Sequence, residues 1–315
     1  MKYEHLFGPV HSRRLGLSLG VDLVPYKYCP LNCVYCEVQR TTHLTLRRRE
    51  FFPLEEITSE LADFLSARPE LDYITFSGAG EPTLYSRIGE VISFIKSHYP
   101  EYKLAVLTNG TLLHNATIRK EILPCDLILP SLDACNQETY RRINRPHQAL
   151  RAEDLVLGLA TLRQEYKGQI WLEVFIIAGI NDTETELDCL SEAIARIAPD
   201  KVQINSLDRP GAEEWVKAAG NAALNRVKQH FEAKLAMPVE IIAKVQAEQF
   251  ETIVPEDVER SISATLQRRP STAEDLAASL GLHINEVSKY LRQLHGEQKI
   301  SVKREKRGVF YAWIH

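Results

Sequence analysis

Three cysteines lie within eight consecutive positions, in the run Cys29-Pro-Leu-Asn-Cys33-Val-Tyr-Cys36. Thiolates hold iron–sulfur clusters, and this close C-x3-C-x2-C spacing lets a single loop bind three irons of a cubane. No fourth cysteine follows nearby, so one iron would stay open to a second molecule, as catalytic metal sites keep an open position. A structural zinc site is the alternative. It needs a fourth ligand, and the nearest histidine, His43, has no zinc-finger spacing.

A second candidate is a run of small residues that ends in an acid and a proline, Ser77-Gly78-Ala79-Gly80-Glu81-Pro82-Thr83. Small residues let the backbone approach a ligand closely, and a carboxylate or carbonyl beside them accepts hydrogen bonds from an ammonium group. Polar pairs recur further along the chain, at Thr108-Asn109 and at Ser131 and Asp133. Asn and Asp are also ordinary turn residues, so these pairs are compatible with plain turns as well.

The elements that position these residues follow from the hydrophobic pattern. Between about residue 17 and residue 242, short β-branched runs alternate with amphipathic stretches of helical period, the pattern of βα units around a parallel sheet. The predicted strands are Leu17–Val24, Asp72–Phe76, Lys103–Leu107, Asp126–Pro130, Ile170–Ile177 and Lys201–Asn205, with a weaker run at Pro238–Ile242. The predicted helices are Leu54–Leu65, Ser86–Ser97, Ala152–Tyr166, Glu184–Ile197 and Ala212–Leu235.

The residues that could do chemistry lie just after the predicted strands. In barrel-like parallel folds, the loops at the carboxyl ends of the strands converge at one mouth. We therefore predict an α/β fold in which residues 1–250 form a partial (β/α)6 TIM-like barrel, with the cysteines and the polar loops gathered into one site.

The cysteine spacing, with Tyr35 directly before Cys36, resembles the signature of the radical S-adenosylmethionine (SAM) superfamily. The resemblance implies that Cys29, Cys33 and Cys36 bind three irons of a [4Fe-4S] cluster, while SAM chelates the fourth iron through its amino and carboxylate groups. It also implies an enzyme that receives one electron from flavodoxin or ferredoxin. Reductive cleavage of SAM then gives methionine and a 5′-deoxyadenosyl radical, which abstracts hydrogen from a substrate that the sequence does not identify.

The resemblance covers most of the chain from Leu17 to Asn205 and implies contacts with SAM. The glycine-rich run is similar to the family's Gly-Gly-Glu-Pro motif, with Ala79 in place of one usual glycine, and the later strand ends are similar to segments beside the SAM carboxylate, ribose and adenine. The SAM-binding residues implied in this way are Gly78, Gly80, Glu81, Pro82, Thr108, Asn109, Ser131, Asp133, Ile177, Asn205 and Tyr35. Asn181 and Ser206 are further candidates beside adenine.

Within this superfamily the chain looks most like an Fe-S oxidoreductase branch related to the wyosine-forming tRNA enzymes. The members that make the tricyclic tRNA base carry a second cluster, and no second cysteine triplet occurs in this sequence, so their reaction is not carried over. Two arginine-containing runs, His11–Gly16 and Arg141–His147, are expected near the mouth of the barrel. Their guanidinium groups could grip a carboxylate or phosphate of SAM or of the substrate, or could simply be solvated charge.

The composition is that of a globular protein, with 44% hydrophobic residues, 25% charged residues and a formal net charge of −4. No apolar run is long enough to span a bilayer and the N-terminus lacks a signal-peptide core, so we expect a cytoplasmic protein without membrane contact. Reducing compartments keep thiols free. The remaining cysteines, Cys125, Cys135 and Cys189, share no ligand spacing and are predicted to be small buried hydrophobes.

From about Pro255 the pattern changes to three short helices and a basic hairpin, which resembles a winged helix-turn-helix domain over residues 256–315. The predicted helices are Val258–Arg268, a second from the Ser271-Thr272 cap to Gly281, and a third from about Asn285 to His295; the hairpin pairs Lys299–Lys303 with Val309–Ile314. In the third helix we expect Ile284, Val287, Leu291 and Leu294 to face inward and Asn285, Ser288, Lys289, Arg292 and Gln293 to face outward.

The outward face of that helix could enter a major groove, and the wing residues Lys303, Arg304, Lys306 and Arg307 could contact phosphates. A net charge of only +2 over residues 256–315 is low for a nucleic-acid domain, so docking of a protein or peptide is equally open. Three functions follow. The chain could modify a nucleic acid or peptide delivered by the winged helix, modify a small molecule with a structural appendix, or act as a DNA-binding regulator that responds to SAM or redox state.

Overall fold

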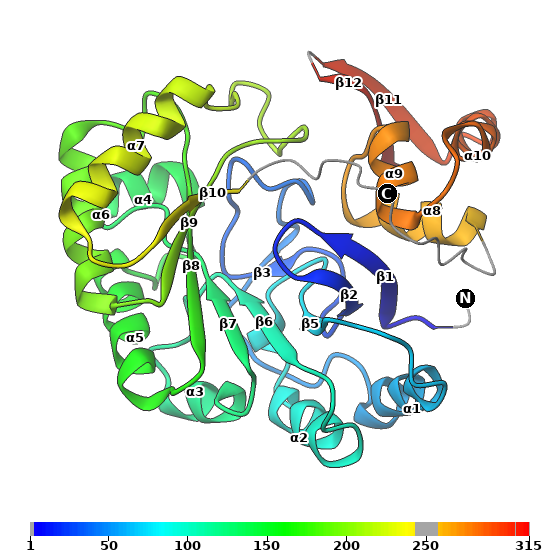
Figure 1. Cartoon of the computed structure of the whole chain (residues 1–315), viewed down its shortest axis with the longest axis horizontal. Helices are drawn as coiled ribbons and strands as arrows, with labels where there is room; N and C mark the ends of the chain where they lie inside the picture. Colours follow the sequence, from blue (N-terminus) through cyan, green and yellow to red (C-terminus); the bar gives the residue numbers. More distant parts are fainter. Residues whose placement is uncertain (1–2, 243–257, 306, 315) are drawn as a thin grey trace.

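The centre of the molecule is a curved, mostly parallel sheet (Figure 1). The structure is a computed structural model that describes residues 3–242, 258–305 and 307–314. Eight strands pair in the order β1-β2-β5-β6-β7-β8-β9-β10. Their bounds are β1 Leu6–Ser12, β2 Gly16–Val21, β5 Tyr73–Phe76, β6 Leu104–Thr108, β7 Leu127–Pro130, β8 Gln169–Phe175, β9 Lys201–Asn205 and β10 Val239–Ile241. From β2 to β10 every pairing is parallel, which confirms the predicted partial barrel.

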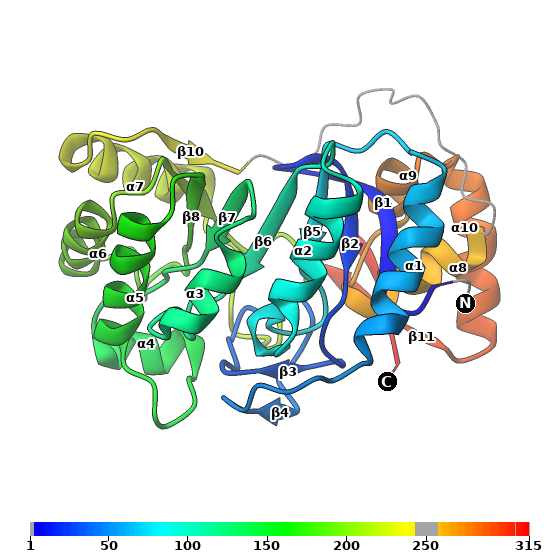
Figure 2. The same cartoon turned by 90° about the horizontal axis from the view of Figure 1, so that it is seen from below.

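Helices cover the convex face of the sheet, as Figures 1 and 2 show. They are α1 Leu54–Ser66, α2 Ile88–His98, α3 Ala116–Ile122, α4 Gln137–Asn144, α5 Ala152–Glu165, α6 Glu184–Ile197 and α7 Asn221–Lys234. The sequence analysis missed α3 and α4 and began the last helix too early. Residues 212–220 are not helical; α7 begins only after Gly220, which is its N-cap in extended conformation. No helix among the described residues is long and apolar enough to cross a membrane.

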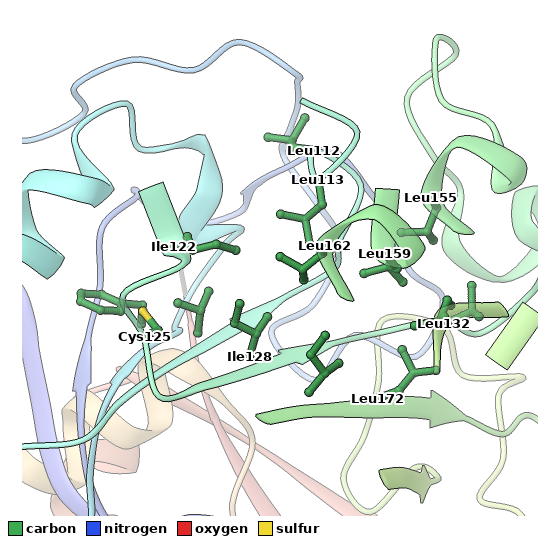
Figure 3. Packing of buried hydrophobic residues seen from close by; sticks show 14 of the residues in the cluster. Leu112, Leu113, Ile122, Cys125, Ile128, Leu132, Leu155, Leu159, Leu162 and Leu172 are labelled. Atoms are coloured by element: carbon green, nitrogen blue, oxygen red, sulfur yellow. The ribbon is translucent and has the colours of Figure 1, made fainter. Parts of the chain in front are cut away.

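The interface between the helices and the sheet is a continuous apolar core. Leu155, Leu159 and Leu162 form the predicted stripe of α5 and are buried in one apolar cluster with Ile128 of β7 and Leu132 (Figure 3). Each such buried leucine contributes about 1.5–3 kcal/mol relative to an exposed one. This packing fixes the strands, and therefore fixes where the loops at their carboxyl ends begin.

The two edges of the sheet differ. β1 pairs antiparallel with β2 and forms one edge, while β10 forms the other, so the barrel is open between them. The sequence analysis did not predict β1. Two short strands outside this sheet, β3 (Tyr28–Cys29) and β4 (His43–Leu44), pair with each other and carry the first cysteine.

The C-terminal residues 258–314, called the C-terminal unit below, form three helices and a hairpin in the predicted order. The elements are α8 Val258–Arg268, α9 Ala273–Leu280, α10 Ile284–Gly296, β11 Ile300–Glu305 and β12 Gly308–Trp313. The unit has its own apolar core, and α8 and α9 pack against β1. The predicted capping box is present, with Thr272 and Asp275 as its members. The predicted domain boundary lies outside the described residues.

One expectation for α10 is wrong. Val287, Leu291 and Leu294 are buried as predicted, but Ile284, at the first turn of the helix, is 37% exposed. The predicted outward residues Asn285, Lys289, Arg292 and Gln293 are exposed, and Ser288 is partly so. In Figure 1, α10 lies on the far side of α8 and α9 from the barrel.

Candidate active site

The three clustered cysteines lie in one loop that begins in β3 and turns back through a hydrogen bond from Cys36 N to Cys33 O. Each sulfur has a nitrogen donor beside it. The contacts are Asn109 Nδ2 to Cys29 Sγ at 3.4 Å, Asn144 Nδ2 to Cys33 Sγ at 3.4 Å, and Lys27 Nζ to Cys36 Sγ at 3.1 Å. Donors of this kind stabilise sulfur in its thiolate form and tune a metal bound to it.

Burial opposes ionisation of two of these thiols. It raises the pKa of Cys29 to about 12 and the pKa of Cys33 well above its usual range. Thiolates at these positions therefore require a neighbouring positive charge, which bound iron supplies. Two buried polar atoms of α4, Tyr140 Oη and Asn144 Oδ1, have no hydrogen-bond partner in the described structure, and Cys33 acts electrostatically on Tyr140. The donor set and these unpaired atoms fit a polar metal cluster in the loop.

A single zinc ion fits less well. No group of three or more Cys, His, Asp or Glu side chains within the described ranges is arranged to hold one metal ion. His43, the alternative fourth ligand, is exposed, and its ring stacks on Tyr28 with centroids 4.1 Å apart. In a cubane each thiolate binds a different iron, so the sulfurs need not converge on one point.

The glycine-rich run lies directly against the cysteine loop. Lys27 N donates to Ala79 O at 2.9 Å, and Glu81 N donates to Tyr28 O at 3.0 Å. A Cβ atom on Gly80 would lie 2.3 Å from Tyr28 O, so only glycine permits this approach. The prediction that these two motifs meet at the carboxyl ends of neighbouring strands agrees with the structure.

Glu81 connects the loops after β5 and β6. Its side chain is buried, and its carboxylate accepts hydrogen bonds from Thr83 N, Thr83 Oγ1, Thr108 Oγ1 and Asn109 N at 2.6–3.1 Å. Burial raises the pKa of Glu81, while these donors act to lower it. The Glu81 carboxylate thus holds these two loops in place through its hydrogen bonds. The next residue, Pro82, is buried at the start of a short 3-10 helix, Pro82–Leu84.

Asp133, after β7, is a second buried centre of hydrogen bonds. It accepts from Tyr35 Oη at 2.5 Å, Asn144 Nδ2 at 2.7 Å and Phe175 N at 2.9 Å. The ring of Tyr35 stacks on Phe175 with centroids 3.8 Å apart. Burial raises the pKa of Asp133 to about 6, against the lowering effect of these three donors. Asp133 therefore ties the cysteine loop to α4 and β8.

The remaining residues predicted to contact SAM also make contacts within the protein, some of them more than others. Asn181 is fully buried; its Nδ2 donates to Asp133 O and Phe175 O, and its Oδ1 accepts from Ile177 N. Ile177 lies beyond the end of β8 and packs in a small apolar cluster with Val34. At the end of β9, Asn205 Nδ2 donates to Glu173 at 3.4 Å. Ser131 forms a bridge with Glu173, and Ser206 Oγ donates to Ile176 O.

The arginine-containing runs bind carboxylates of the protein itself. From the β1–β2 turn, Arg14 donates to Glu173 of β8, and Arg13 lies 3.8 Å from Asp208 after β9. These pairs span the open side of the barrel. In the second run, Arg145 Nη1 donates to Glu213 at 2.5 Å, whereas Arg141 and Arg142 are exposed. The interpretation of these runs as solvated charge holds for Arg141 and Arg142.

The C-terminal unit contacts Asp22, beside the glycine-rich loop, from outside the barrel. Arg268, at the end of α8, donates to Asp22 Oδ2 through Nε at 2.8 Å and Nη2 at 2.5 Å. The other oxygen of Asp22 accepts from Ala79 N at 3.0 Å. Gly78 has φ of +135°, and a Cβ there would lie 1.5 Å from Asp22 Oδ1. A residue of the C-terminal unit therefore braces the glycine-rich loop through one aspartate.

The β11–β12 hairpin, called the wing because it is the predicted wing of the winged helix, also faces the barrel. Two of its four predicted phosphate-binding residues pair with carboxylates of the protein, and phosphate binding stays a prediction. Arg307 pairs with Asp208 at 2.7 Å and with Asp275, and Lys303 pairs with Glu214 at 3.3 Å and with Glu305 at 3.2 Å. Of the other two wing residues, Arg304 is exposed and Lys306 lies outside the described residues.

Two of the three separate cysteines were interpreted wrongly. Cys135 and Cys189 form a disulfide with Cα atoms 6.1 Å apart, which joins the loop after β7 to α6. Their sequence separation of 54 residues gives no local signal for pairing. Cys125 is buried as predicted, and burial raises the pKa of its thiol.

Several residues of the site were not singled out from the sequence. Lys27 carries charge beside Cys36, Asn144 contacts Cys33, and Glu173 joins β8 to Arg14 and Asn205. A lysine two positions before the first cysteine was the available signal for Lys27, and Asn144 stood inside the arginine-containing run. Glu173 alternates with apolar residues on β8 and so faces the barrel interior.

Comparison with known proteins agrees with this geometry. The family described as "Radical SAM superfamily" matches residues 23–189, a segment that includes the cysteine loop and ends within α6. The chain belongs to the radical SAM superfamily. It is therefore an enzyme of the class that uses a [4Fe-4S] cluster and SAM.

Curated relatives extend the match beyond this segment. A protein of Brachyspira hyodysenteriae named "GTPase Obg" is 34% identical over 95% of this chain, and the chain spans 44% of that protein's length. The G-x-x-x-x-G-K-[S/T] pattern of P-loop GTPases does not occur in the present sequence. A UPF0026 protein of Methanocaldococcus jannaschii is 31% identical over 85% of this chain and 83% of its own length, so this radical SAM protein also belongs with the UPF0026 proteins.

Solved structures show the same fold. A radical SAM methyltransferase from Sphaerobacter thermophilus superposes with a TM-score of 0.57 at 16% identity, covering 71% of this chain and 65% of its own. At this identity the likeness extends to the fold alone. It confirms the partial barrel, while the C-terminal unit as a winged helix stays a prediction.

Proposed function

We propose that this radical SAM enzyme holds its [4Fe-4S] cluster through Cys29, Cys33 and Cys36 and uses SAM to start hydrogen abstraction from a small-molecule substrate. The observation that carries the proposal is the cysteine loop itself, in which each of the three sulfurs has a polar donor beside it and no fourth ligand is in place among the residues that the structure describes. When bound, the cluster and SAM supply one-electron cleavage of a carbon–sulfur bond to give the 5′-deoxyadenosyl radical.

The protein's own residues hold the reactants in place. Glu81 fixes the turn that places Asn109 beside Cys29, and Asp133 fixes the Asn144 amide beside Cys33. The loop of Gly78 to Glu81 offers close backbone approach next to the cysteines, where the SAM ammonium group would bind. Lys27 places its ammonium group 3.1 Å from the Cys36 sulfur.

The position of the C-terminal unit favours a small molecule over a nucleic acid or peptide. Helix α10 lies on the side of α8 and α9 away from the barrel (Figure 1), so its exposed residues are not next to the cysteine loop. The wing residues Lys303 and Arg307 are already paired with carboxylates of the described structure. A reduced flavodoxin or ferredoxin is the electron donor that we propose, because the superfamily requires a one-electron reductant.

Anaerobic incubation of the reconstituted full chain with dithionite, SAM and small-molecule or macromolecular fractions of a cell extract tests the proposal. We expect 5′-deoxyadenosine to form, and deuterium to enter it from a labelled small-molecule fraction. Deuterium transfer only from the macromolecular fraction would exclude the small-molecule proposal. Zinc in place of iron after reconstitution would exclude the radical reaction altogether.

A further inference from the structure

Lys27 is a buried lysine whose side chain ends at the cysteine loop. It stands two positions before Cys29, and the residue is only 3% exposed. Its Nζ lies 3.1 Å from Cys36 Sγ. In the described part of the chain, no carboxylate lies within ion-pair distance of this ammonium group. Burial of an ammonium group without an opposite charge is costly, so the direction in which Lys27 points calls for an explanation.

The backbone holds Lys27 in a fixed and uncommon conformation. Its φ is +59°, in the left-handed region that a lysine seldom adopts. The peptide groups on its two sides are both bound, since Lys27 N donates to Ala79 O at 2.9 Å and His43 N donates to Lys27 O at 3.1 Å. Residues held in such conformations by their surroundings concentrate at functional sites. The glycine-rich loop and β4 therefore fix the position from which this side chain reaches Cys36.

Lys27 differs from the other donors at the three sulfurs because it carries charge. Asn109 and Asn144, at the other two sulfurs, donate through uncharged amides. The charge of Lys27 also reaches Cys29: burial raises the pKa of that thiol and the Glu81 carboxylate adds to the effect, whereas Lys27 opposes it. Lys27 is thus a cation placed to respond to the charge at more than one of the cysteines.

We propose that Lys27 is the electrostatic partner of the bound [4Fe-4S] cluster, and that its ammonium group, acting through the Cys36 sulfur, raises the reduction potential of the cluster. Reduction brings one electron from the electron donor and transfers no atom, so it adds one negative charge beside this cation. Net charge and hydrogen bonds to the sulfurs set the potential of a cluster, and a cation acts most strongly where water is excluded. Lys27 makes the cluster easier for the electron donor to reduce. This inference rests on the proposed function, because it takes the three cysteines to be the cluster ligands.

The test measures the midpoint potential of the cluster in anaerobically reconstituted full-length protein. Dithionite is the titrant, and electron paramagnetic resonance follows the reduced cluster. Lys27→Met removes the charge but keeps an unbranched stem, so we expect its iron content to match that of the unaltered protein. The equilibrium constant for reduction should fall at least tenfold, which for one electron is a shift of about 59 mV to more negative potential.

Three further variants separate charge from packing and from hydrogen bonding. Lys27→Gln keeps a donor without the charge, and its potential should shift in the same direction as that of Lys27→Met. Lys27→Arg keeps the charge, so it should recover most of the shift. Lys289→Met removes an exposed lysine of α10 and should leave the potential unchanged. A merely structural role for Lys27 would not produce this order.

An unchanged potential in Lys27→Met or Lys27→Gln with full iron content would overturn the proposal, because the lysine would then only pack in the loop. Loss of iron from both uncharged variants would overturn it as well, since Lys27 would then be needed to build the site. If the unaltered protein forms 5′-deoxyadenosine but its potential does not respond to Lys27, only this inference fails. Zinc in the unaltered protein would instead exclude the proposed function itself.

Discussion

The side of the barrel that carries the cysteines and its open side stabilise carboxylates with different kinds of hydrogen-bond donor. Around the cysteines, Glu81 and Asp133 accept hydrogen bonds from hydroxyl, amide and backbone donors, none of which carries charge. On the open side, Asp208 and Asp275 are held by arginines. Uncharged donors leave a negative charge in place, whereas arginines cancel it.

This difference changes the charge that each side keeps. A region that keeps its negative charge suits a cationic ligand such as the sulfonium and ammonium groups of SAM. A region whose carboxylates are paired with arginines keeps no such negative charge. The two sides of the barrel thus differ in the charge that their buried groups keep, and the following experiments can break or sharpen that contrast.

Loss of a cysteine is expected to have the largest effect. Replacing Cys29, Cys33 or Cys36 with alanine removes one of only three thiolates, so the reconstituted chain should lose its iron and all cleavage of SAM. Iron and sulfide content per chain measure this. Cys125→Ala, in the apolar core, should keep the cluster. A triple-alanine variant that still holds four irons would refute the assignment.

Gly78→Ala is expected to be the next most damaging change. The added Cβ would lie 1.5 Å from Asp22 Oδ1 in a backbone of positive φ, so the glycine-rich loop must move. We expect a loss of about 2–3 kcal/mol in unfolding free energy and at least tenfold weaker SAM binding. Gly179→Ala is the matched control, because its φ is +77° and nothing lies within 4 Å of an added Cβ. Equal losses in the two variants would contradict the role of Asp22.

Asp133→Asn tests whether the uncharged donors around Asp133 surround a titrating carboxyl group. The measurement is the pH dependence of protein stability. Burial raises the pKa of Asp133 from 3.8 to about 6, so the unfolded chain gives up this proton at lower pH than the folded chain. This group alone should lower the stability of the unaltered protein by up to about 3 kcal/mol between pH 4 and pH 6. The variant lacks the titration. The difference in unfolding free energy, variant minus unaltered protein, should therefore rise between pH 4 and pH 6 and stay constant above pH 7. A difference that does not depend on pH would disprove this account.

Arg268→Gln should have the smallest effect. It removes the ion pair with Asp22, which is partly exposed, so we expect a loss of about 1–2 kcal/mol and a rise of several-fold in the dissociation constant for SAM. Arg292→Gln should change neither quantity. Because Asp22 also holds Ala79 N, an unchanged SAM affinity would show that the C-terminal unit is attached to the loop without influencing it.

The barrel could be predicted largely from sequence because its strands are buried on both faces and appear as apolar runs. Strand β9 and helix α6 have the predicted bounds, and the other parallel strands differ by a few residues at their ends. The places of the cysteine loop and of the glycine-rich loop could then be predicted, because each loop follows a predicted strand. Strand β1 escaped notice because Gly8 and Pro9 interrupt its pattern. Helix α4 escaped because it has few apolar residues.

The connections between distant residues could not be predicted. Arg268 and Asp22 are 246 residues apart, and nothing local marks either as the partner of the other. The same holds for the Cys135–Cys189 disulfide. Periodicity reports which face of an element is buried, but ion pairs and disulfides depend on where the finished fold brings side chains together.

The attachment of the C-terminal unit to β1 has a consequence for how the chain is made. On the ribosome the barrel emerges first, and its outer edge strand stays uncovered until the final helices have left the exit tunnel. An uncovered edge strand is a template for pairing with another chain. Nascent chains that stall after β10 should therefore aggregate or recruit chaperones, whereas chains that include α8 and α9 should not.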